Sequence, residues 1–435
     1  ASALYLTEEA GAVRTLDAWL PFTLQLEQSA AKEDTQILFD CRVCSADARL
    51  VNSRKLLFRV EVGAQIFGFS AETAEFPLLK NTPDGLQLRC RNYPIPLPSE
   101  TAERSFLVSD ELELPVGRPA AAAVIAANVM PEATEQRIVG NKAVFKGSMQ
   151  VKILYLAADG SVNLFSQSLP FSQYCQLGAD YDEDQMQLLL AVTGCDVQMQ
   201  SSTEARSFLV SVDLLAQCLV TQCTTLTFCE DAFSTQGVLT PEWAEFRFEG
   251  QLDRQTLRQA VRETLHGEAL RGVIDSEVFP DFPIAEQTAQ GPRLTVPLAM
   301  RVLGFDAEGT LCGLSGTAQC VCEVPAADGT VCRAAASLCP DAYAAPAPDG
   351  AELRCDLSLQ ICTCAEQQLR TLSGGTIGPE PEAERRPSLI IRRTAGAVPI
   401  WDLAKQYRTS TESICAANDL SGDEAGAGTL LLIPM

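Results

Sequence analysis

The feature that most constrains the fold is an internal repeat, in which similar residues recur at an offset close to 150 positions. A fixed period of this kind indicates a chain built from similar structural units rather than from unrelated domains. The matching residues include a turn glycine and the strand-like run that follows it. Gly11, Val13 and Leu20-Pro21-Phe22 recur 149 positions later as Gly160, Val162 and Leu169-Pro170-Phe171.

A third copy follows at the same spacing. The run Ile125–Pro131 recurs as Ile274–Pro280, again 149 positions later. Each copy has a glycine (Gly11, Gly160 or Gly309) at the end of a short segment, where a hairpin turn requires a positive φ. The first copy begins in the middle of the repeat, so we expect one half copy and two complete copies.

Within the copies the hydrophobic pattern predicts short β-strands. Apolar and polar residues alternate in runs such as Phe145–Leu156, Gln187–Val192 and Leu353–Ile361, and Gly, Pro and Asp bound these runs. The chain is therefore expected to be mainly β, with tandem β-rich repeats of about 150 residues.

One segment inside the repeats predicts a helix instead. In Arg254–His266, the apolar residues Leu257, Val261 and Leu265 are four positions apart, as on one face of a helix. This helix would bridge two β modules. His266 would then cap its C-terminus, where a positive charge is favoured.

The end of the chain has a different composition. Residues 373–387 combine Gly, Pro and charged residues without a hydrophobic period, which is typical of a linker. The segment 388–435 then predicts a strand, two short helices and a closing strand, a small α+β (βααβ) domain. The expected organisation is a partial first repeat at 1–107, a second repeat at 108–223, a third repeat with the bridging helix at 224–372, a linker at 373–387 and the terminal domain at 388–435.

Charge and histidine content exclude several classes of function. The formal net charge is -23, from 33 basic and 56 acidic residues, which disfavours binding to nucleic acid. His266 is the only histidine, so Ser-His-Asp and multi-histidine metal sites are not expected. The acidic cluster at Asp180–Asp184 lacks the glycine and distal glutamate of a calcium loop and predicts a solvated loop. We expect no catalytic residues, no metal and no cofactor, although an enzyme with an unfamiliar carboxylate site is a weaker alternative.

The 17 cysteines favour a reducing compartment. Several lie two residues apart in strand-like runs, where neighbours on one face do not easily form a disulfide. They are interpreted as small buried hydrophobes of a cytoplasmic protein. The longest apolar stretch, Ala120–Met130, is far shorter than a membrane span, and the first residues show no signal peptide. No transmembrane segment is expected.

The terminal segment resembles a LysM domain. The resemblance rests on Ile390–Arg393 for the first strand, Ile400–Tyr407 and Ile414–Leu420 for the two helices, and Leu430–Pro434 for the closing strand. The family's usual Gly-Asp-Thr before the first helix is here Ala397-Val398-Pro399. This replacement removes polar groups that a glycan-binding groove often offers, so sugar binding is disfavoured.

The repeats are similar to the SPOCS domain of spore-coat proteins. The similarity rests on Ile125–Pro131, on the strand pair Gly140–Leu156 and on Leu169–Ser172, which occur together and in order. SPOCS repeats followed by one LysM resemble a family of spore morphogenetic proteins. The resemblance implies a non-enzymatic scaffold or adaptor of the spore coat, cytoplasmic on the mother-cell side, at the forespore surface.

The resemblance also implies partners. The LysM would dock on a SpoIVA-like coat ATPase, and the repeats would bind other coat proteins or self-associate. The alternative is a cell-wall protein whose LysM reads peptidoglycan or chitin.

The candidate partner-binding surface is formed by two loops of the terminal domain, Gly396–Pro399 and Asn418–Ser421, with two arginines beside them. Trp401 is either an interface anchor or a core residue, because apolar residues flank it on the first helix. The predicted residues are Arg392, Arg393, Gly396, Ala397, Val398, Pro399, Trp401, Asn418, Asp419 and Leu420.

Overall fold

The computed structural model describes most of the chain. The described residues are 2–7, 12–25, 27, 32–33, 35–70, 83–181, 185–200, 205–289, 291–325, 330–340, 342–379 and 387–435, without the side chains of 185 and 249–252. The first turn glycine, Gly11, the acidic residues 182–184 and residues 380–386 of the expected linker lie outside them.

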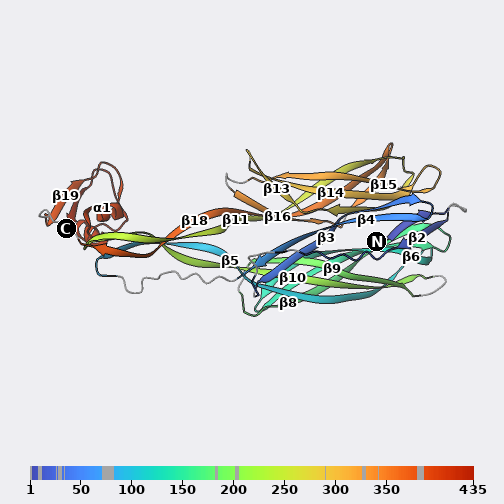
Figure 1. Ribbon diagram of the computed structural model, residues 1–435, viewed down its shortest axis with the longest axis horizontal. Coiled ribbons are helices and arrows are strands. Elements are labelled where there is room, and N and C mark those ends of the chain that lie inside the picture. The colour runs from blue at the N-terminus through green and yellow to red at the C-terminus, as the bar shows by residue number, and fades with distance from the viewer. Residues whose placement is uncertain are drawn as a thin grey trace. The chain divides into compact units, whose positions relative to one another are not determined.

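The chain is mainly β, as predicted (Figure 1). The described strands are β1 (Ser2–Leu6), β2 (Val13–Asp17), β3 (Gln36–Asn52), β4 (Lys55–Phe69), β5 (Leu86–Glu113), β6 (Ala121–Val139), β7 (Lys142–Ala157), β8 (Val162–Gln176), β9 (Gln185–Met199), β10 (Ser207–Ser234), β11 (Val238–His266), β12 (Gly272–Pro280), β13 (Ile284–Thr288), β14 (Gly291–Phe305), β15 (Leu311–Glu323), β16 (Thr330–Leu338), β17 (Tyr343–Ala347), β18 (Gly350–Gly378), β19 (Leu389–Arg393), β20 (Val398–Pro399), β21 (Glu424–Ala425) and β22 (Leu430–Pro434). The two described helices are α1 (Ile400–Tyr407) and α2 (Thr411–Asn418). Neither is long and apolar enough to cross a membrane.

The chain divides into two compact units. The first unit is Ala1–Ala71, Pro96–Gln222 and Gln251–Ala365, and the second is Glu72–Ile95, Cys223–Gly250 and Glu366–Met435. The strands β5, β10, β11 and β18 each have residues in both units. These units cut across the domains expected from the repeat, whose boundaries stay a prediction.

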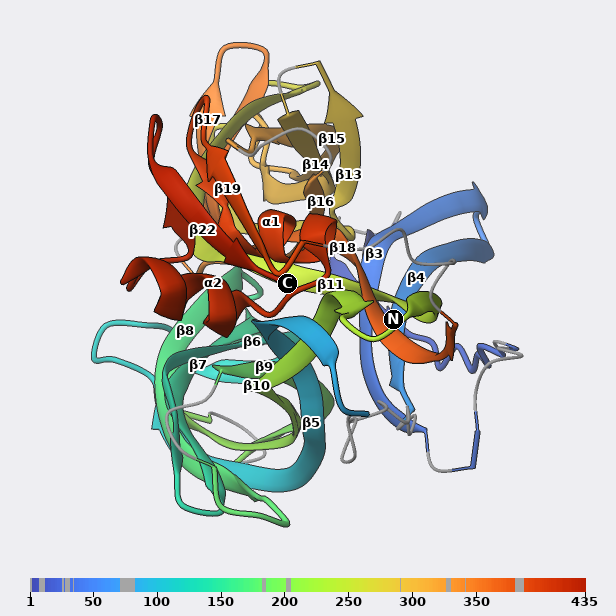
Figure 2. The same ribbon diagram turned by 90° about the vertical axis from the view of Figure 1, so that its left-hand side faces the viewer.

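The first unit contains three groups of strands, which are called bodies and numbered in chain order. The second body surrounds the largest hydrophobic core among the described residues. It consists of the sheets β5-β10-β9 and β6-β7-β8, which curl around the core in Figure 2. Alternation along β10 explains why this strand has one buried face: Phe208, Val210, Val212 and Leu214 are fully buried, and the residues between them face outward. At the β7–β8 hairpin, Gly160 has the predicted positive φ of 86°.

A third body has the same order of strands. Its sheets are β11-β18-β16 and β12-β14-β15. β12 and β13 pair with the same edge of β14, β12 with its second half and β13 with its first. β17 also pairs with β18. Apart from β13 and β17, each described strand of this body has a counterpart in the second body, with β11 in the place of β5 and β18 in the place of β10. Its turn glycine, Gly309, has a φ of 83°, as predicted.

A first body contains fewer strands. It consists of the pairs β1-β2 and β3-β4, each of which is a separate two-stranded sheet. β3 contacts the third body, because Arg42 donates a hydrogen bond to the Ala336 carbonyl at 2.9 Å and stacks over Phe282. The Cys44 thiol donates to Asp281 at 3.2 Å.

The predicted bridging helix at Arg254–His266 is wrong, because these residues belong to strand β11. A spacing of four fits a strand as well as a helix, since it is twice the strand period of two. Leu257, Val261 and Leu265 accordingly point to one face of β11 and pack into the third body's core. His266 therefore caps no helix; its ring nitrogen Nδ1 pairs with Asp349 at 2.9 Å at the exposed end of β11.

The second unit combines a β ribbon with the terminal module, residues 387–435. The ribbon consists of the parts of β5, β10, β11 and β18 that lie in this unit. In the ribbon, Phe228 of β10 contacts the rings of Tyr93, Phe246 and Phe248. The backbone amide of Cys229 donates to the Thr371 hydroxyl of β18 at 3.0 Å. β18 continues to Gly378, so the first six residues of the predicted linker are strand.

The interpretation of cysteines as small buried residues is confirmed for nine of the 17, and all of these except Cys339 lie in strands. Cys320 and Cys322 both face inward from β15, as their spacing of two predicted. The buried cysteines are Cys175, Cys218, Cys229, Cys320, Cys322, Cys332, Cys339, Cys355 and Cys364. Cys41, Cys90, Cys195 and Cys223 are exposed instead.

The strand assignment of β11 leads to a stability prediction. Leu265→Ala should lower the free energy of unfolding by about 2–4 kcal/mol, because Leu265 is almost fully buried in the third body's core and truncation leaves a cavity. Denaturant unfolding followed by circular dichroism measures this change. The matched control is Thr256→Ala, on the exposed face of the same strand. Equal effects of the two substitutions would contradict the assigned inward face.

Candidate functional site

The terminal module has the predicted order of strand, two helices and strand. β19 pairs with β22 along Leu389–Arg393, and the two helices lie between these strands in the chain. Ile400, Leu403 and Ile414 from the helices pack with Leu431 and Ile433 from β22. The amphipathic pattern of the helices thus explains how so short a segment forms a core.

Local interactions set the ends of both helices. Pro399 precedes the first residue of α1, as its fixed φ favours. The Ser410 hydroxyl caps α2 by accepting a hydrogen bond from the Ser413 amide at 3.0 Å. Arg408 and Asp419 end the helices with positive φ values of 52° and 49°.

Two predicted site residues hold the module together. Asn418 donates to the carbonyls of Ile414 and Leu432 at 2.8 and 2.6 Å, and its side-chain oxygen accepts from the Leu432 amide at 2.7 Å. Arg392 donates to Gln406 at 2.6 Å and to the Tyr407 hydroxyl at 3.1 Å, at the end of α1. Both side chains therefore join elements of the module.

The first predicted loop pairs with a segment that lies just after the second predicted loop in the chain. Val398 and Pro399 form β20, whose partner is β21 at Glu424–Ala425. The amide of Ile400 also donates to the Asp423 carbonyl at 2.8 Å. The segment that pairs with the first loop is thus 423–425. Arg393, Gly396, Ala397 and Asp419 are exposed, and Leu420 packs partly against the core.

Trp401 joins the module to the ribbon. Its indole Nε1 donates to Asp231 Oδ2 at 2.8 Å, and its ring meets the Phe233 ring edge-on with a centroid distance of 5.0 Å. Lys405, one turn further along α1, donates to Asp231 Oδ1 at 2.6 Å. Phe233 belongs to the same cluster as the module's own core. Trp401 is thus at once a core residue and the anchor of an interface within the chain.

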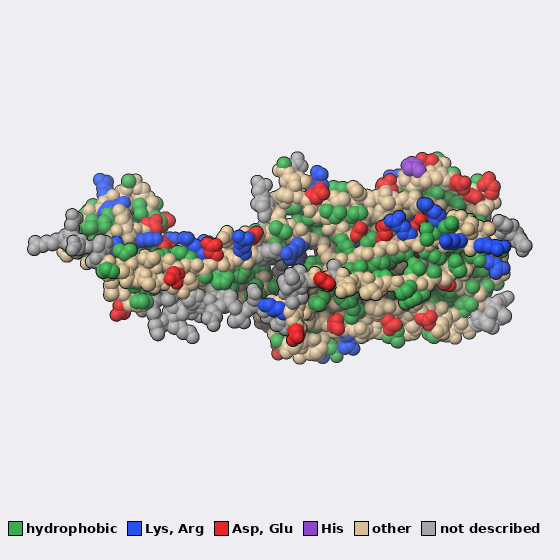
Figure 3. All heavy atoms as spheres, viewed as in Figure 1, with side chains coloured by type: hydrophobic (Ala, Val, Ile, Leu, Met, Phe, Trp, Pro, Cys, Tyr) green, Lys and Arg blue, Asp and Glu red, His purple; other side chains and the backbone are tan. Residues whose placement is uncertain are grey.

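Basic side chains surround this anchor. Arg89 of β5 lies over the Trp401 ring at 5.6 Å, and Arg370 of β18 lies over Trp243 at 4.7 Å. Figure 3 shows Lys and Arg side chains along the ribbon. Guanidinium groups are attracted to the faces of aromatic rings, so Arg89 adds to the contact at Trp401.

The charge state of Asp231 favours the contact. Burial opposes ionisation of its carboxyl group, but hydrogen bonds from Lys405 and Trp401 and the positive charge of Lys405 outweigh burial. The pKa of Asp231 is therefore lowered from its ordinary value of 3.8. The carboxylate is ionised at neutral pH and accepts both hydrogen bonds.

The sequence alone did not reveal Asp231 and Phe233 as neighbours of Trp401. They lie about 170 residues earlier in the chain, at the end of a strand that the repeat pattern describes only as β. One signal was available in the sequence: the charged Asp231 stands directly before the apolar Ala232 and Phe233, which are buried in the structure.

The described side chains form no group of three or more His, Cys, Asp or Glu residues that could hold a metal ion. Burial is the main cause that raises the pKa of the Cys355 thiol to about 11, so this group is protonated at neutral pH.

The comparison with protein families concerns the second body. Residues 121–200 match the family model described as SipL, SPOCS domain. The chain carries a SPOCS domain. The matched residues span β6, β7, β8 and β9, which supply the sheet β6-β7-β8 and the edge strand of the facing sheet. The predicted SPOCS similarity is therefore confirmed for this segment, and it indicates a SipL-like, sporulation-related protein. No curated protein and no solved structure matches the chain.

The Trp401 contact leads to a prediction about the second unit. Asp231→Ala should lower the stability of the terminal module by about 1–2 kcal/mol, since it removes the acceptor of two hydrogen bonds, one of them from a charged donor. Hydrogen exchange of the α1 amides should become faster. Asp402→Ala is the control: it removes an exposed carboxylate that only favours the dipole at the first turn of the same helix, so it should speed exchange less than Asp231→Ala does. Unchanged exchange in Asp231→Ala would show that the contact does not support the helix.

The lowered pKa of Asp231 predicts a pH dependence. Because the folded pKa lies below the unfolded one, the stabilisation is complete above about pH 4 and is lost as the pH falls through the folded value. The indole N–H resonance of Trp401 in an NMR titration should therefore shift only below about pH 4. Asp231→Asn, which has no charge to titrate, should abolish the shift. A transition near neutral pH would contradict the assignment.

Proposed function

We propose that the protein is a non-enzymatic scaffold or adaptor of spore morphogenesis, built from tandem SPOCS domains and a C-terminal LysM domain. The observation that carries this proposal is the SPOCS match at residues 121–200, together with the same order of strands in the third body. The shared topology supports the repeat seen in the sequence and favours a second SPOCS domain at β11–β18.

The LysM assignment is supported by the terminal module itself. Its strand, helix, helix and strand order, its paired outer strands and its length agree with the resemblance of residues 388–435 to that family. The exposed residues Arg393, Gly396, Ala397 and Asp419 remain accessible to a partner. Trp401 and Asn418 form hydrogen bonds within the chain, so we assign them a structural role that supports this surface.

In this proposal the LysM recruits the protein to the forespore surface, on the mother-cell side, by binding a SpoIVA-like ATPase. The SPOCS domains then bind other coat proteins or a second copy. The replacement of polar residues by Ala397-Val398-Pro399 favours a protein over a sugar at this loop. Binding of peptidoglycan or chitin by the LysM is the alternative function.

A paired binding experiment tests the proposal. The full chain should retain purified SpoIVA-like ATPase in a pull-down and should not sediment with insoluble peptidoglycan. Ala397→Glu, which places a charge on the predicted surface, should weaken the protein complex by about tenfold or more. Ser388→Glu, at an exposed position beside the opposite end of β19, also introduces a glutamate; it is the control and should bind as the unmodified chain.

Two results would contradict the proposal, the first its partner and the second its assigned surface. Retention on peptidoglycan without any binding of the ATPase would favour the cell-wall alternative. Binding of the ATPase that is unaffected by Ala397→Glu would show that the surface is misassigned, although the recruitment itself would stand.

A further inference from the structure

The ribbon brings together two cysteines that come from different strands. Cys90 lies in β5 and Cys229 in β10, and these strands are neighbours in one sheet. Both residues belong to the second unit, and both have free thiols. Cys90 is exposed, whereas Cys229 is buried. The function proposed above gives neither of them a role.

Contacts on both sides of this pair show how the two strands are aligned. The Thr227 hydroxyl donates a hydrogen bond to Asn92 Oδ1 at 2.8 Å, and the Thr235 amide donates to the Gly85 carbonyl at 2.8 Å. The partner residues therefore move back along β5 as the chain advances along β10, which makes the strands antiparallel. Two residues beyond Thr227, this register places the two cysteines opposite each other.

The two thiols also point to the same face of the ribbon. Alternation places Leu88 on the same face of β5 as Cys90, and Leu88 packs into the cluster that contains Cys229. The opposite face carries Tyr93 and Phe228, whose ring centroids lie 5.7 Å apart. A hydrogen bond joins the side chains of Cys90 and Cys229. The two sulfur atoms are therefore direct neighbours.

The spacing of opposite residues in an antiparallel pair suits a disulfide. Their Cα atoms lie about 4.5 Å apart at a non-hydrogen-bonded position and about 5.5 Å apart at a hydrogen-bonded one. A disulfide accommodates Cα separations of about 4.4–6.8 Å. Rotation of the two side chains can therefore join Cys90 to Cys229 without a change in the strand register.

Two other thiol pairs among the described residues meet these requirements less well. The sulfur atoms of Cys362 and Cys364 lie 3.6 Å apart. These residues are two positions apart on one strand, where the Cα separation of about 6.6 Å is near the upper limit for a disulfide. Cys175 and Cys218 form a hydrogen bond inside the second body, but both are fully buried. An oxidant in solvent therefore does not reach them.

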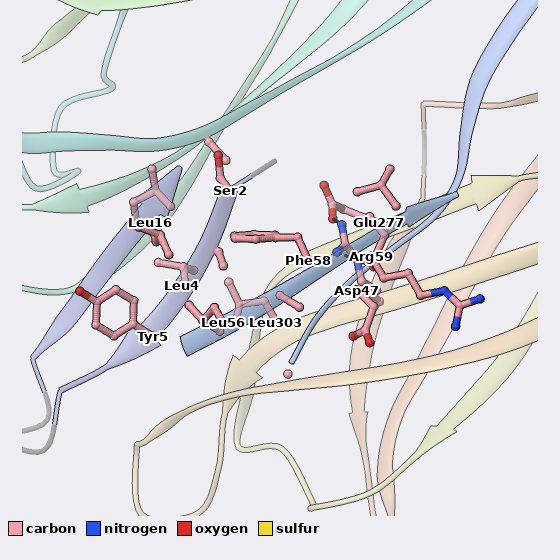
Figure 4. A pocket seen from close by; sticks show the side chains of 18 of the residues that line it. Ser2, Leu4, Tyr5, Leu16, Asp47, Leu56, Phe58, Arg59, Glu277 and Leu303 are labelled. Atoms are coloured by element: carbon pink, nitrogen blue, oxygen red, sulfur yellow. Dashed lines mark hydrogen bonds and ion pairs between the residues drawn. The ribbon is translucent and has the colours of Figure 1, made fainter. Parts of the chain in front are cut away.

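The groove of the first unit contains no such pair. Its volume is about 2420 Å³, and Figure 4 shows Leu4, Leu56 and Phe58 among the residues that line it. Cys312 is the only cysteine among the described residues that line this groove. The ribbon is therefore the better place to look for a site built from two thiols.

The two thiols of the ribbon differ in their access to solvent and in their protonation. Burial is the main cause that raises the pKa of Cys229, and the neighbouring Cys90 raises it further. The Cys229 thiol is therefore protonated at neutral pH, and its Sγ donates to the Asp231 carbonyl at 3.5 Å. Cys90 is exposed, so it meets an oxidant in solvent first.

We propose that Cys90 and Cys229 are a redox modification site, which hydrogen peroxide converts to a cross-strand disulfide between β5 and β10. Cys90 loses its proton to solvent, and its thiolate attacks one oxygen of the peroxide. An S–O bond forms and the O–O bond breaks. The released hydroxide takes up a proton and becomes water, and Cys90 becomes a sulfenic acid.

Cys229 completes the reaction. Its sulfur attacks the Cys90 sulfur, so that the S–S bond forms as the S–O bond breaks. The released hydroxide takes the proton of the Cys229 thiol and becomes a second water. The two thiols thus lose two electrons and two protons, and one hydrogen peroxide is reduced to two waters.

The disulfide fixes the part of the ribbon that holds the terminal module. Asp231, which accepts a hydrogen bond from Trp401, follows Cys229 by two residues on β10. Arg89, which lies over the Trp401 ring, directly precedes Cys90 on β5. Oxidation therefore links covalently the two strands that contact Trp401, and it holds their register beside the docked module.

Peptide mapping of the full chain by mass spectrometry under non-reducing conditions tests the site. Hydrogen peroxide should produce a linked pair of peptides that contain Cys90 and Cys229. Dithiothreitol should reverse the link, because exposed disulfides are easily reduced. Cys90→Ser should abolish the linked pair. The matched control, Cys223→Ser, removes another exposed cysteine of the ribbon and should leave the linked pair unchanged.

A trap for sulfenic acid tests the order of the two steps. In Cys229→Ser, no thiol attacks the sulfenic acid of Cys90, so dimedone should label Cys90 about tenfold more than in the unmodified chain. Cys223→Ser should leave this labelling unchanged. Circular dichroism checks that the variants fold, and Cys90→Ser, which alters an exposed side chain, keeps the test decisive if Cys229→Ser does not fold.

Hydrogen exchange measures the effect on the ribbon. In the oxidised chain, the β5 and β10 amides beside the disulfide should exchange about tenfold more slowly than in the reduced chain, since a cross-link disfavours the opened state. Cys90→Ser treated with peroxide should exchange at the rate of the reduced chain. Equal rates in the oxidised and reduced chains would contradict the inference that the disulfide holds the two strands.

Three outcomes of the chemical tests would overturn the proposal. The first is the absence of a linked pair of Cys90 and Cys229 from the folded chain after treatment with peroxide. The second is the linkage of Cys90 to several cysteines in similar yield. The third is dimedone labelling of Cys90 that a folded Cys229→Ser variant does not increase.

Discussion

The structure depends on one requirement of β-sheets: each sheet must bury one face and pair its strand edges. In the second and third bodies two sheets face each other, and the alternating residues of β10 and β18 fill the space between them. The longest strands, β5, β10, β11 and β18, each meet this requirement in a body and then continue into the ribbon. In the first body, the described strands form two separate two-stranded sheets, β1-β2 and β3-β4.

In the second unit the same long strands meet a helical module. The ribbon contributes Phe233 to the module's core and Asp231 to the hydrogen bonds of Trp401 and Lys405. A short module with few core residues gains buried area in this way, which small domains need for stability. The ribbon therefore stabilises the module that carries the surface proposed to bind a partner.

Much of the fold could be predicted from the sequence, because alternation, turn glycines and the repeat are local or periodic signals. Gly160 and Gly309 adopt the expected positive φ. The helix predicted at Arg254–His266 failed because a spacing of four is compatible with both helix and strand. The site was less accessible: no local pattern connects Trp401 with Asp231, and the hydrogen bonds that engage Asn418 depend on the closing strand.

The docking of Trp401 on β10 has a consequence for how this chain can evolve. The terminal module is separate in sequence, but part of its core is encoded near residue 233. Recombination that exchanged the last segment for another LysM-like domain would separate Trp401 and Lys405 from Asp231. Substitutions at these positions are therefore expected to be coupled, and a transplanted terminal domain would need a compatible ribbon to be inherited with it.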